Sequence, residues 1–245
     1  DLVAVYNRAV SKAEQVAERY GVPKVYGDPE ELLANEELDF VDIITEVPAH
    51  ASLVLLAAKH KVPVICQKPM AADLETCRKM VEACRTAGIP FFVHENFRWE
   101  TQIRALKHAI DEDRIGAPFR ARIQFVHGLP TIFENQPFLK TLEHFALTDV
   151  GSHLLDLARF FFGEPQTLYC QHHSTRDDIA GEDVASVMLR IGDLICNCEM
   201  SYSTETEWGH FPETLVYIEG KKGTIELAPD YWLRITADGR TEAQR

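Results

Sequence analysis

The fold class follows from residues 40–70, FVDIITEVPAHASLVLLAAKHKVPVICQKPM, in which two short apolar runs enclose a helical segment. Phe40–Ile44 and Val62–Cys66 are almost continuously apolar, as strands buried on both faces are. Pro48 fits the first turn of a helix that runs to about Lys59. Strand–helix–strand order with short connections is typical of a parallel sheet.

The same alternation continues on both sides of this stretch. We predict strand 2–6, helix 11–20, a helix between residues 73 and 88, and strand 89–93. Ser11 begins a capping box and Gly21 suits the end of its helix, while Asp73 and Gly88 do the same for the later one. Residues 1–99 are therefore predicted to form a doubly wound α/β domain of the Rossmann type.

The second half of the chain has a different pattern. Helices are predicted at about 100–113 and 148–162, and strands at 119–125, 166–172, 183–191, 194–202, 214–219, 223–227 and 231–236. Gly192-Asp193 and Lys221–Gly223 suit hairpin turns. Residues 100–245 are therefore predicted to be an α+β domain with an open, mainly antiparallel sheet.

Composition excludes several classes of protein. The chain has 25 basic and 38 acidic residues, a net charge of −13, with 46% hydrophobic residues. This is an ordinary globular mixture, and the acidic balance argues against nucleic acid or an anionic membrane as partner. No apolar run reaches 18 residues, and none of the six cysteines forms a CxxC pair. We expect a soluble cytoplasmic protein with reduced thiols.

Polar residues follow the predicted parallel strands, where ligands bind in such sheets. They are Asn7 and Arg8, residues 45–50, residues 66–69, and residues 94–99. Lys68 is held by Pro69, which restricts the backbone before it and makes the lysine a usable electrophile. A solvent-exposed loop lysine explains the same local sequence.

Asp149 and His153 form a second candidate group, four residues apart on a predicted helix. Side chains at this spacing are neighbours, and a carboxylate beside an imidazole suits general acid–base chemistry. An ordinary helix-stabilising pair is the alternative. Glu143 or His144 as a further ligand gives no convincing metal spacing, so we predict no metal.

Together these motifs resemble the Gfo/Idh/MocA oxidoreductases, the family of glucose-fructose oxidoreductase and inositol dehydrogenase. The resemblance covers essentially the whole chain. Val41–His50 resembles the family's cofactor loop, Cys66–Ala71 its Glu-Lys-Pro motif, Thr148–Leu157 its Asp-x-x-x-His helix, and Ile218–Leu227 its late hairpin. Gln67 stands where the family has glutamate.

The resemblance implies the function and the site residues. It implies hydride transfer between a nicotinamide and a sugar, polyol or related substrate, with Lys68, Asp149 and His153 as catalytic residues. Arg98 and Trp99 are expected to reach the substrate beside that catalytic set. The cofactor is expected to contact Asn7, Arg8, Thr45, Glu46, Val47, Pro48, His50, Gln67, Lys68 and Asn96.

Further expectations follow from the same resemblance. Arg8 stands where an acidic residue would bind the ribose of NAD, so the cofactor is NADP or NAD with a lean to NADP. No GxGxxG is present, and the family's first strand and glycine-rich turn are expected to lie outside these residues. A homo-oligomer through the C-terminal sheet is expected. A redox-neutral NAD-dependent glycosidase and a non-catalytic regulatory protein are the alternatives.

Overall fold

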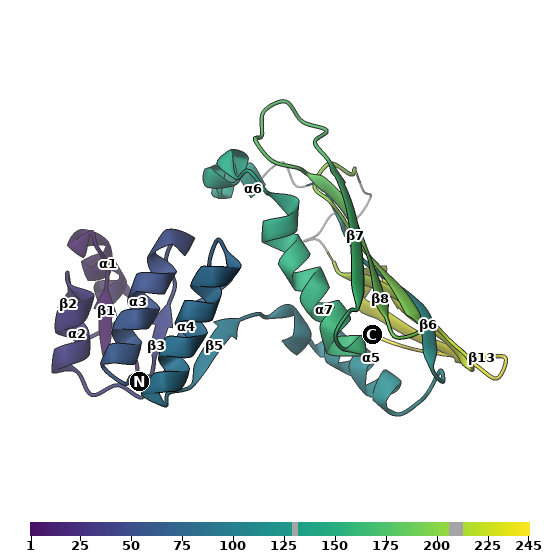
Figure 1. Cartoon of the computed structure of the whole chain (residues 1–245), viewed down its shortest axis with the longest axis horizontal. Helices are drawn as coiled ribbons and strands as arrows, with labels where there is room; N and C mark the ends of the chain where they lie inside the picture. The colour runs from purple at the N-terminus through teal and green to yellow at the C-terminus, as the bar shows by residue number, and fades with distance from the viewer. Residues whose placement is uncertain (129–131, 206–212) are drawn as a thin grey trace. The chain divides into compact units, whose positions relative to one another are not determined.

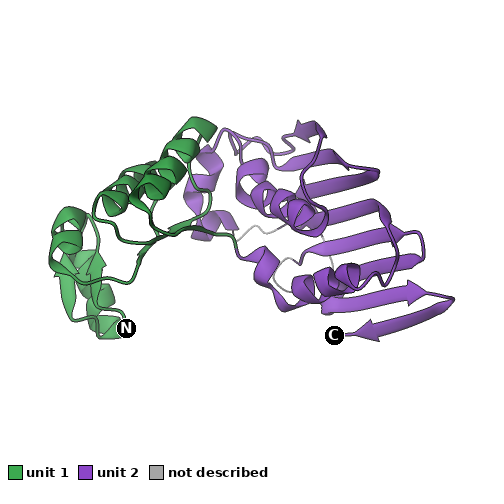
Figure 2. Cartoon of the chain, turned by 60° about the horizontal axis from the view of Figure 1, so that its bottom comes forward, with its two compact units in different colours: residues 1–95 green, residues 96–245 purple. Residues whose placement is uncertain are grey.

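The computed structural model describes residues 1–128, 132–205 and 213–245. These residues form two compact units, Asp1–Glu95 and Asn96–Arg245, which Figure 2 shows in different colours. Each unit has a hydrophobic core of its own. The dinucleotide and substrate roles predicted for the two halves of the chain stay predictions.

The first unit alternates strands and helices along its whole length (Figure 1). Its elements are β1 (Ala4–Tyr6), α1 (Val10–Tyr20), β2 (Lys24–Tyr26), α2 (Pro29–Asn35), β3 (Val41–Ile43), α3 (Val47–Lys59), β4 (Val64–Gln67), α4 (Leu74–Ala87) and β5 (Phe91–His94). All of its strand pairs are parallel: β1 pairs with β2, and β4 lies between β3 and β5.

The core of this unit explains why the strands are apolar. Val64 and Cys66 of β4 are fully buried, in one cluster with Val54 of α3 and Met80 of α4. The two helices lie side by side (Figure 1). A middle strand beneath packed helices has little solvated surface, so continuous apolar runs are favoured there.

The helix ends test the predicted caps. Asp73 accepts a hydrogen bond from the backbone N–H of Thr76 at 2.8 Å, and Gly88 ends α4 in the left-handed conformation, so both caps are confirmed. The capping box at Ser11 is wrong. Helix α1 begins one residue earlier, after Ala9, and its first turn has no side-chain cap.

The second unit is built on one eight-stranded sheet, in the order β13-β12-β11-β10-β6-β9-β8-β7. Its strands are β6 (Pro118–Val126), β7 (Thr167–His173), β8 (Val184–Ile191), β9 (Leu194–Ser201), β10 (Leu215–Gly220), β11 (Gly223–Ala228), β12 (Trp232–Ala237) and β13 (Arg240–Gln244). Neighbouring strands are antiparallel except β6 and β9, which run parallel in the middle. The predicted mainly antiparallel sheet is confirmed, with this one exception.

Two longer helices, α5 (Thr101–Asp111) and α7 (Ser152–Phe162), cover one face of the sheet (Figure 2). Helix α7 packs on β6 and β9, and α5 packs on β11. Leu106 of α5 and Leu154 and Leu157 of α7 are fully buried at these contacts. The shorter helical segments are η1 (Phe97–Trp99), α6 (Ile132–Asn135), η2 (Pro137–Thr141), η3 (Leu147–Gly151) and η4 (Pro229–Tyr231).

The last strand, β13, was not predicted from the sequence. It pairs with β12 through the turn Asp238-Gly239, where both residues have positive φ angles of 51° and 72°. Asp-Gly with positive φ at both positions is a common two-residue hairpin turn. The signal was therefore present, although the exposed, polar residues of β13 lack an apolar pattern.

Candidate functional site

The carboxyl ends of β1 and β3 flank a cavity in the first unit. The cavity has a volume of about 860 Å³ and extends along both strands as far as Asn7 and Thr45. In the described residues β1 pairs only with β2 and β3 only with β4, so the cavity lies between two separate sheets. The cavity runs along the apolar side chains of both strands, such as Val5 and Ile43, and not only at the carboxyl ends, where ligands of doubly wound folds bind.

Asn7 and Arg8 lie at the end of β1, as predicted. The side-chain oxygen of Asn7 accepts a hydrogen bond from the backbone N–H of Ala9 at 2.9 Å, which fixes the turn into α1. Arg8 is exposed. The strand end therefore presents a cation and no carboxylate between residues 7 and 9.

His50 lies in α3 and connects two strand-end loops. Its Nε2 lies 3.1 Å from the carbonyl oxygen of Thr45, and its Nδ1 lies 3.1 Å and 3.3 Å from the carbonyl oxygens of Pro69 and Met70. The side chain is fully buried. The imidazole joins the loops that follow β3 and β4. The predicted contact between His50 and the cofactor stays a prediction.

The other residues predicted from this loop surround the start of α3. Glu46 is its N-terminal flanking residue and makes no side-chain cap, while Val47 and Pro48 form the first turn. Pro48 suits that position because its missing N–H has no helical acceptor there. The hydroxyl of Thr45 is 3.4 Å from the carbonyl oxygen of Glu46.

Gln67 holds the backbone of Lys68 in place. Its side-chain oxygen accepts a hydrogen bond from the Lys68 N–H at 3.0 Å, and its amide nitrogen lies 3.4 Å from Nδ1 of His94. An amide both accepts and donates, whereas a glutamate carboxylate only accepts. Glutamine thus links the ends of β4 and β5 in a way that glutamate matches only if His94 is the donor.

In the second unit, Asp149 and His153 lie on adjoining helical segments. Asp149 belongs to the π-helical turn Leu147–Gly151, and His153 belongs to α7, which continues from it. The predicted single helix from residue 148 to 162 is therefore correct in extent but begins with a wider turn. Short π-helical segments occur frequently at functional sites.

Tyr202 is a partner of Asp149 that the sequence analysis missed. Its hydroxyl donates to Oδ2 of Asp149 at 2.6 Å, and its ring stacks on Phe145. Burial, reinforced by the Asp149 carboxylate, raises the pKa of Tyr202, so the phenol remains a donor. A buried tyrosine usually has a hydrogen-bond partner, which was the available signal.

His153 is held in a defined plane by an aromatic contact. The imidazole stacks on the ring of Phe97 with 4.0 Å between centroids and 4° between planes, and only 5% of His153 is exposed. Phe97 also contacts Phe125 of β6. Phe97 of η1 therefore holds the ring of His153, while Tyr202, which follows β9, holds Asp149.

Glu182 is a second residue that the sequence analysis missed. Its buried carboxylate accepts a hydrogen bond from the backbone N–H of Leu147 at 2.8 Å, and its carbonyl oxygen accepts from Ala146 at 3.0 Å. These bonds hold the start of the π-helical turn. Glu182 thus positions Asp149 through the backbone.

Arg98 has a structural partner that was not expected. Its Nε donates to Oδ2 of Asp156 at 2.8 Å, its Nη2 donates to Oδ1, and the guanidinium lies over the ring of Phe160. The guanidinium group of Arg98 thus joins η1 to α7. The predicted contact of Arg98 with the substrate stays a prediction. Trp99 is 66% exposed, and Asn96 precedes η1 without forming a side-chain cap.

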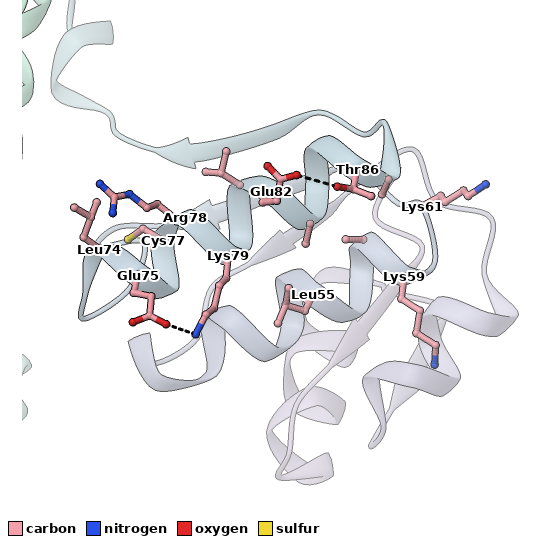
Figure 3. Close-up of a pocket in the computed structure, with 14 residues that line it drawn as sticks. Leu55, Lys59, Lys61, Leu74, Glu75, Cys77, Arg78, Lys79, Glu82 and Thr86 are labelled. Carbon is pink, nitrogen blue, oxygen red and sulfur yellow. Dashed lines mark hydrogen bonds and ion pairs between the residues drawn. The ribbon is translucent and has the colours of Figure 1, made fainter.

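A second hollow lies on the outer surface of α3 and α4 (Figure 3). It has a volume of about 1120 Å³ and is lined by apolar side chains such as Leu55 and Leu74. The ion pair of Glu75 with Lys79, at 2.7 Å, lies at its edge. None of the predicted site residues lines it, so the strand ends remain the candidate site.

The described part of the chain lacks two kinds of feature. No three His, Cys, Asp or Glu side chains are grouped there as in a metal site. No helix there is long and apolar enough to cross a membrane.

Comparison with known proteins adds family matches to this geometry. Residues 1–95 match the model described as oxidoreductase family, NAD-binding Rossmann fold. Residues 103–226 match the model of the GFO/IDH/MocA C-terminal domain.

Individual relatives are similar over nearly the whole chain. D-apiose dehydrogenases of Rhizobium rhizogenes and Paraburkholderia graminis are 41% and 40% identical over 96% of this chain, which spans 68% and 63% of their lengths. A crystal structure of an oxidoreductase from Agrobacterium radiobacter, in complex with NAD+, L-tartaric acid and magnesium, is 40% identical with a TM-score of 0.95. The match covers 99% of this chain and 71% of that one.

The contacts of His50 lead to a prediction about stability. Replacing His50 with leucine removes the ring nitrogens that lie beside the carbonyl oxygens of Thr45 and Pro69. We expect the free energy of unfolding to fall by about 1–3 kcal/mol, measured by urea denaturation. The exposed His172→Leu variant is the control and should change it by less than about 0.5 kcal/mol. An unchanged unfolding midpoint in His50→Leu would contradict the assigned role.

Proposed function

Because the chain belongs to the Gfo/Idh/MocA oxidoreductase family, we propose that it transfers a hydride between a nicotinamide dinucleotide and a small aldose such as D-apiose. The observation that carries the proposal is the 41% identity to a D-apiose dehydrogenase over 96% of this chain. The matches to family models and relatives confirm the predicted family and fold class. They also confirm the predicted class of enzyme, an NAD(P)-dependent oxidoreductase of sugars or polyols.

The strand ends of the first unit support a dinucleotide site. Asn7 and Thr45 directly follow β1 and β3 or lie close after them, at the carboxyl ends where ligands of doubly wound folds bind. Arg8 adds a cation at one of these termini. We propose that Asn7, Arg8, and Thr45–Pro48 contact the cofactor there.

The chemistry divides between the cofactor and the chain. The bound nicotinamide accepts or gives the hydride. We propose that the ammonium group of Lys68 donates a hydrogen bond to the reacting oxygen and stabilises the negative charge that develops on it. Gln67 supports this role, because its bond to the Lys68 N–H fixes the backbone from which the side chain extends.

We propose that His153 takes the proton from the reacting hydroxyl, or returns it in the reduction direction. The ring's stacking on Phe97 fixes its orientation, so little entropy is lost when the proton is transferred. Asp149 supplies negative charge on the same stretch of helix and is held by the Tyr202 hydroxyl. The carboxylate favours the protonated imidazole that forms during oxidation.

The exposed sheet face supports the proposal of a homo-oligomer. The face opposite α5 and α7 presents Tyr169, Met188, Ile195 and Tyr217, each at least 40% exposed. Tyr169 and Met188 are direct neighbours on β7 and β8. A group of large apolar side chains on an uncovered sheet is typical of an interface between proteins. We propose that two copies pack through this face.

The proposed reaction is tested by a substrate panel. D-Apiose, other aldoses and polyols are incubated with NAD or NADP and the full-length gene product, and absorbance of reduced nicotinamide is followed. We expect the highest kcat/KM with an aldose. A redox-neutral glycosidase would cleave an added aryl glycoside without a net change in nicotinamide absorbance, and a regulatory protein would turn over none of the compounds.

The proposed catalytic roles predict the effect of two substitutions. Lys68→Ala and His153→Ala should each lower kcat by about 10²- to 10⁴-fold, since each removes a group that acts in the transition state. Cofactor binding, followed by fluorescence titration, should remain measurable. The exposed Lys12→Ala and His172→Ala variants are matched controls. Normal turnover in either test variant would refute its role.

Arg8 predicts the choice of cofactor. A guanidinium pairs well with the 2′-phosphate of NADP, so we propose a preference for NADP. Arg8→Ala should lower kcat/KM with NADP by about 10- to 100-fold and leave that with NAD nearly unchanged. Equal losses with both cofactors would show that Arg8 does not discriminate between them.

The proposed interface predicts the effect of a charge on the sheet. Met188→Lys should reduce the mass of the particle in solution, measured by light scattering after size exclusion, because a buried ammonium opposes association. Tyr20→Lys, on exposed α1, is the control and should leave the mass unchanged. An unchanged mass in Met188→Lys would exclude this face as the interface.

A further inference from the structure

His127 directly follows β6 and continues its parallel pairing with β9. Its backbone N–H donates to the carbonyl oxygen of Ser201 at 2.8 Å. The last aligned pair of the two strands is Val126 with Ser201. The next residues along both strands, His127 and Tyr202, therefore lie beside each other. Two residues of neighbouring strands are thereby brought together, although 75 positions separate them in the sequence.

His127 lies on the sheet face that α7 covers. Side chains alternate along a strand, so His127 shares its face with Phe125 two residues earlier. Phe125 is buried and contacts the rings of Phe97 and Tyr202. Those two rings are the ones that contact His153 and Asp149. His127 is therefore on the face of the sheet that holds the proposed proton-transfer residues.

The imidazole of His127 differs from those of the other buried histidines. His50 contacts three carbonyl oxygens, and His153 stacks on Phe97. In contrast, His127 is only 6% exposed, and neither of its ring nitrogens has a hydrogen-bond partner among the residues that the structure describes. Buried polar atoms are nearly always paired, so two unpaired atoms on one ring require an explanation.

We propose that His127 recognises a hydroxyl group of the sugar other than the one that reacts, an inference that rests on the proposed function. A neutral imidazole has one N–H donor and one nitrogen acceptor, and a sugar hydroxyl is likewise both donor and acceptor. The donor and the acceptor of the ring therefore match those of a sugar hydroxyl. His127 is thus a specificity-determining residue, while the proton transfer stays with His153.

The consequence is discrimination between sugars. A sugar with a hydroxyl at the recognised position gives the buried ring its partner, whereas a sugar without that hydroxyl leaves the ring unpaired. The penalty applies to the deoxy sugar only while the imidazole is present. Removing the imidazole should therefore weaken the activity on the natural sugar and remove the discrimination at the same time.

The experiment compares His127→Leu with the wild-type full-length protein, using the best sugar of the panel and its monodeoxy derivatives. We expect the wild type to prefer the parent over one derivative by about 10- to 100-fold in kcat/KM. In His127→Leu the kcat/KM of the parent should fall by that factor, and that of the derivative should stay the same. His127→Gln, which both donates and accepts, should recover part of the preference.

Stability provides an independent readout. His127→Leu should unfold at the same temperature as the wild type or higher, because an unpaired polar ring is replaced by an apolar side chain. A ring that serves only to bind a buried water would give a lower Tm and unchanged discrimination, which would overturn the proposal. The exposed His172→Leu variant is the control for both measurements.

The remaining outcomes separate this inference from the proposed function. If the wild type turns over sugars but His127→Leu lowers kcat/KM equally for parent and derivatives, the recognition role of His127 is wrong and the proposed function stands. If the wild type turns over no sugar with either cofactor, the proposed function is wrong and this inference falls with it.

Discussion

The parallel pairing of β6 with β9 determines which side chains meet at the end of the eight-stranded sheet. In a parallel pair both strands end at the same edge, so His127 and Tyr202 become neighbours there. Tyr202 then reaches Asp149, and Phe125 on the same face contacts Phe97, which stacks on His153. An antiparallel pair would bring the start of one strand to the end of the other and separate these groups.

The two units use histidine in different ways. In the first, both ring nitrogens of His50 lie beside backbone carbonyl oxygens, and the ring joins the loops after β3 and β4. In the second, the ring of Phe97 covers one face of His153, and the edge of the imidazole is where we propose that a proton is transferred. Sequence position identified both as candidates, and their contacts distinguish a histidine that joins two loops from a histidine with a proposed catalytic role.

Much of the fold could be predicted, because strand and helix periods and the caps at Asp73 and Gly88 depend on local sequence. Asp149 and His153 could be identified as candidates because a four-residue spacing is also local. The contacts of Tyr202 and Glu182, and the ion pair of Arg98 with Asp156, could not be predicted, because the partners lie 53, 35 and 58 positions away. Such contacts depend on which strands become neighbours, and a pattern within one element does not specify that.

The place of β6 in the sheet also has a consequence for how the chain folds. Its two neighbours, β9 and β10, are made from residues that follow it by about 75 and 95 positions. While the chain is synthesised, Ile123 and Phe125 of β6 stay unpaired until β9 and β10 have been made. By contrast, β7, β8 and β9 follow one another in the sequence and pair with their direct neighbours. Pairings this distant close large loops and slow the search for the native state, so this unit should fold slowly and require chaperones more than a meander of the same size.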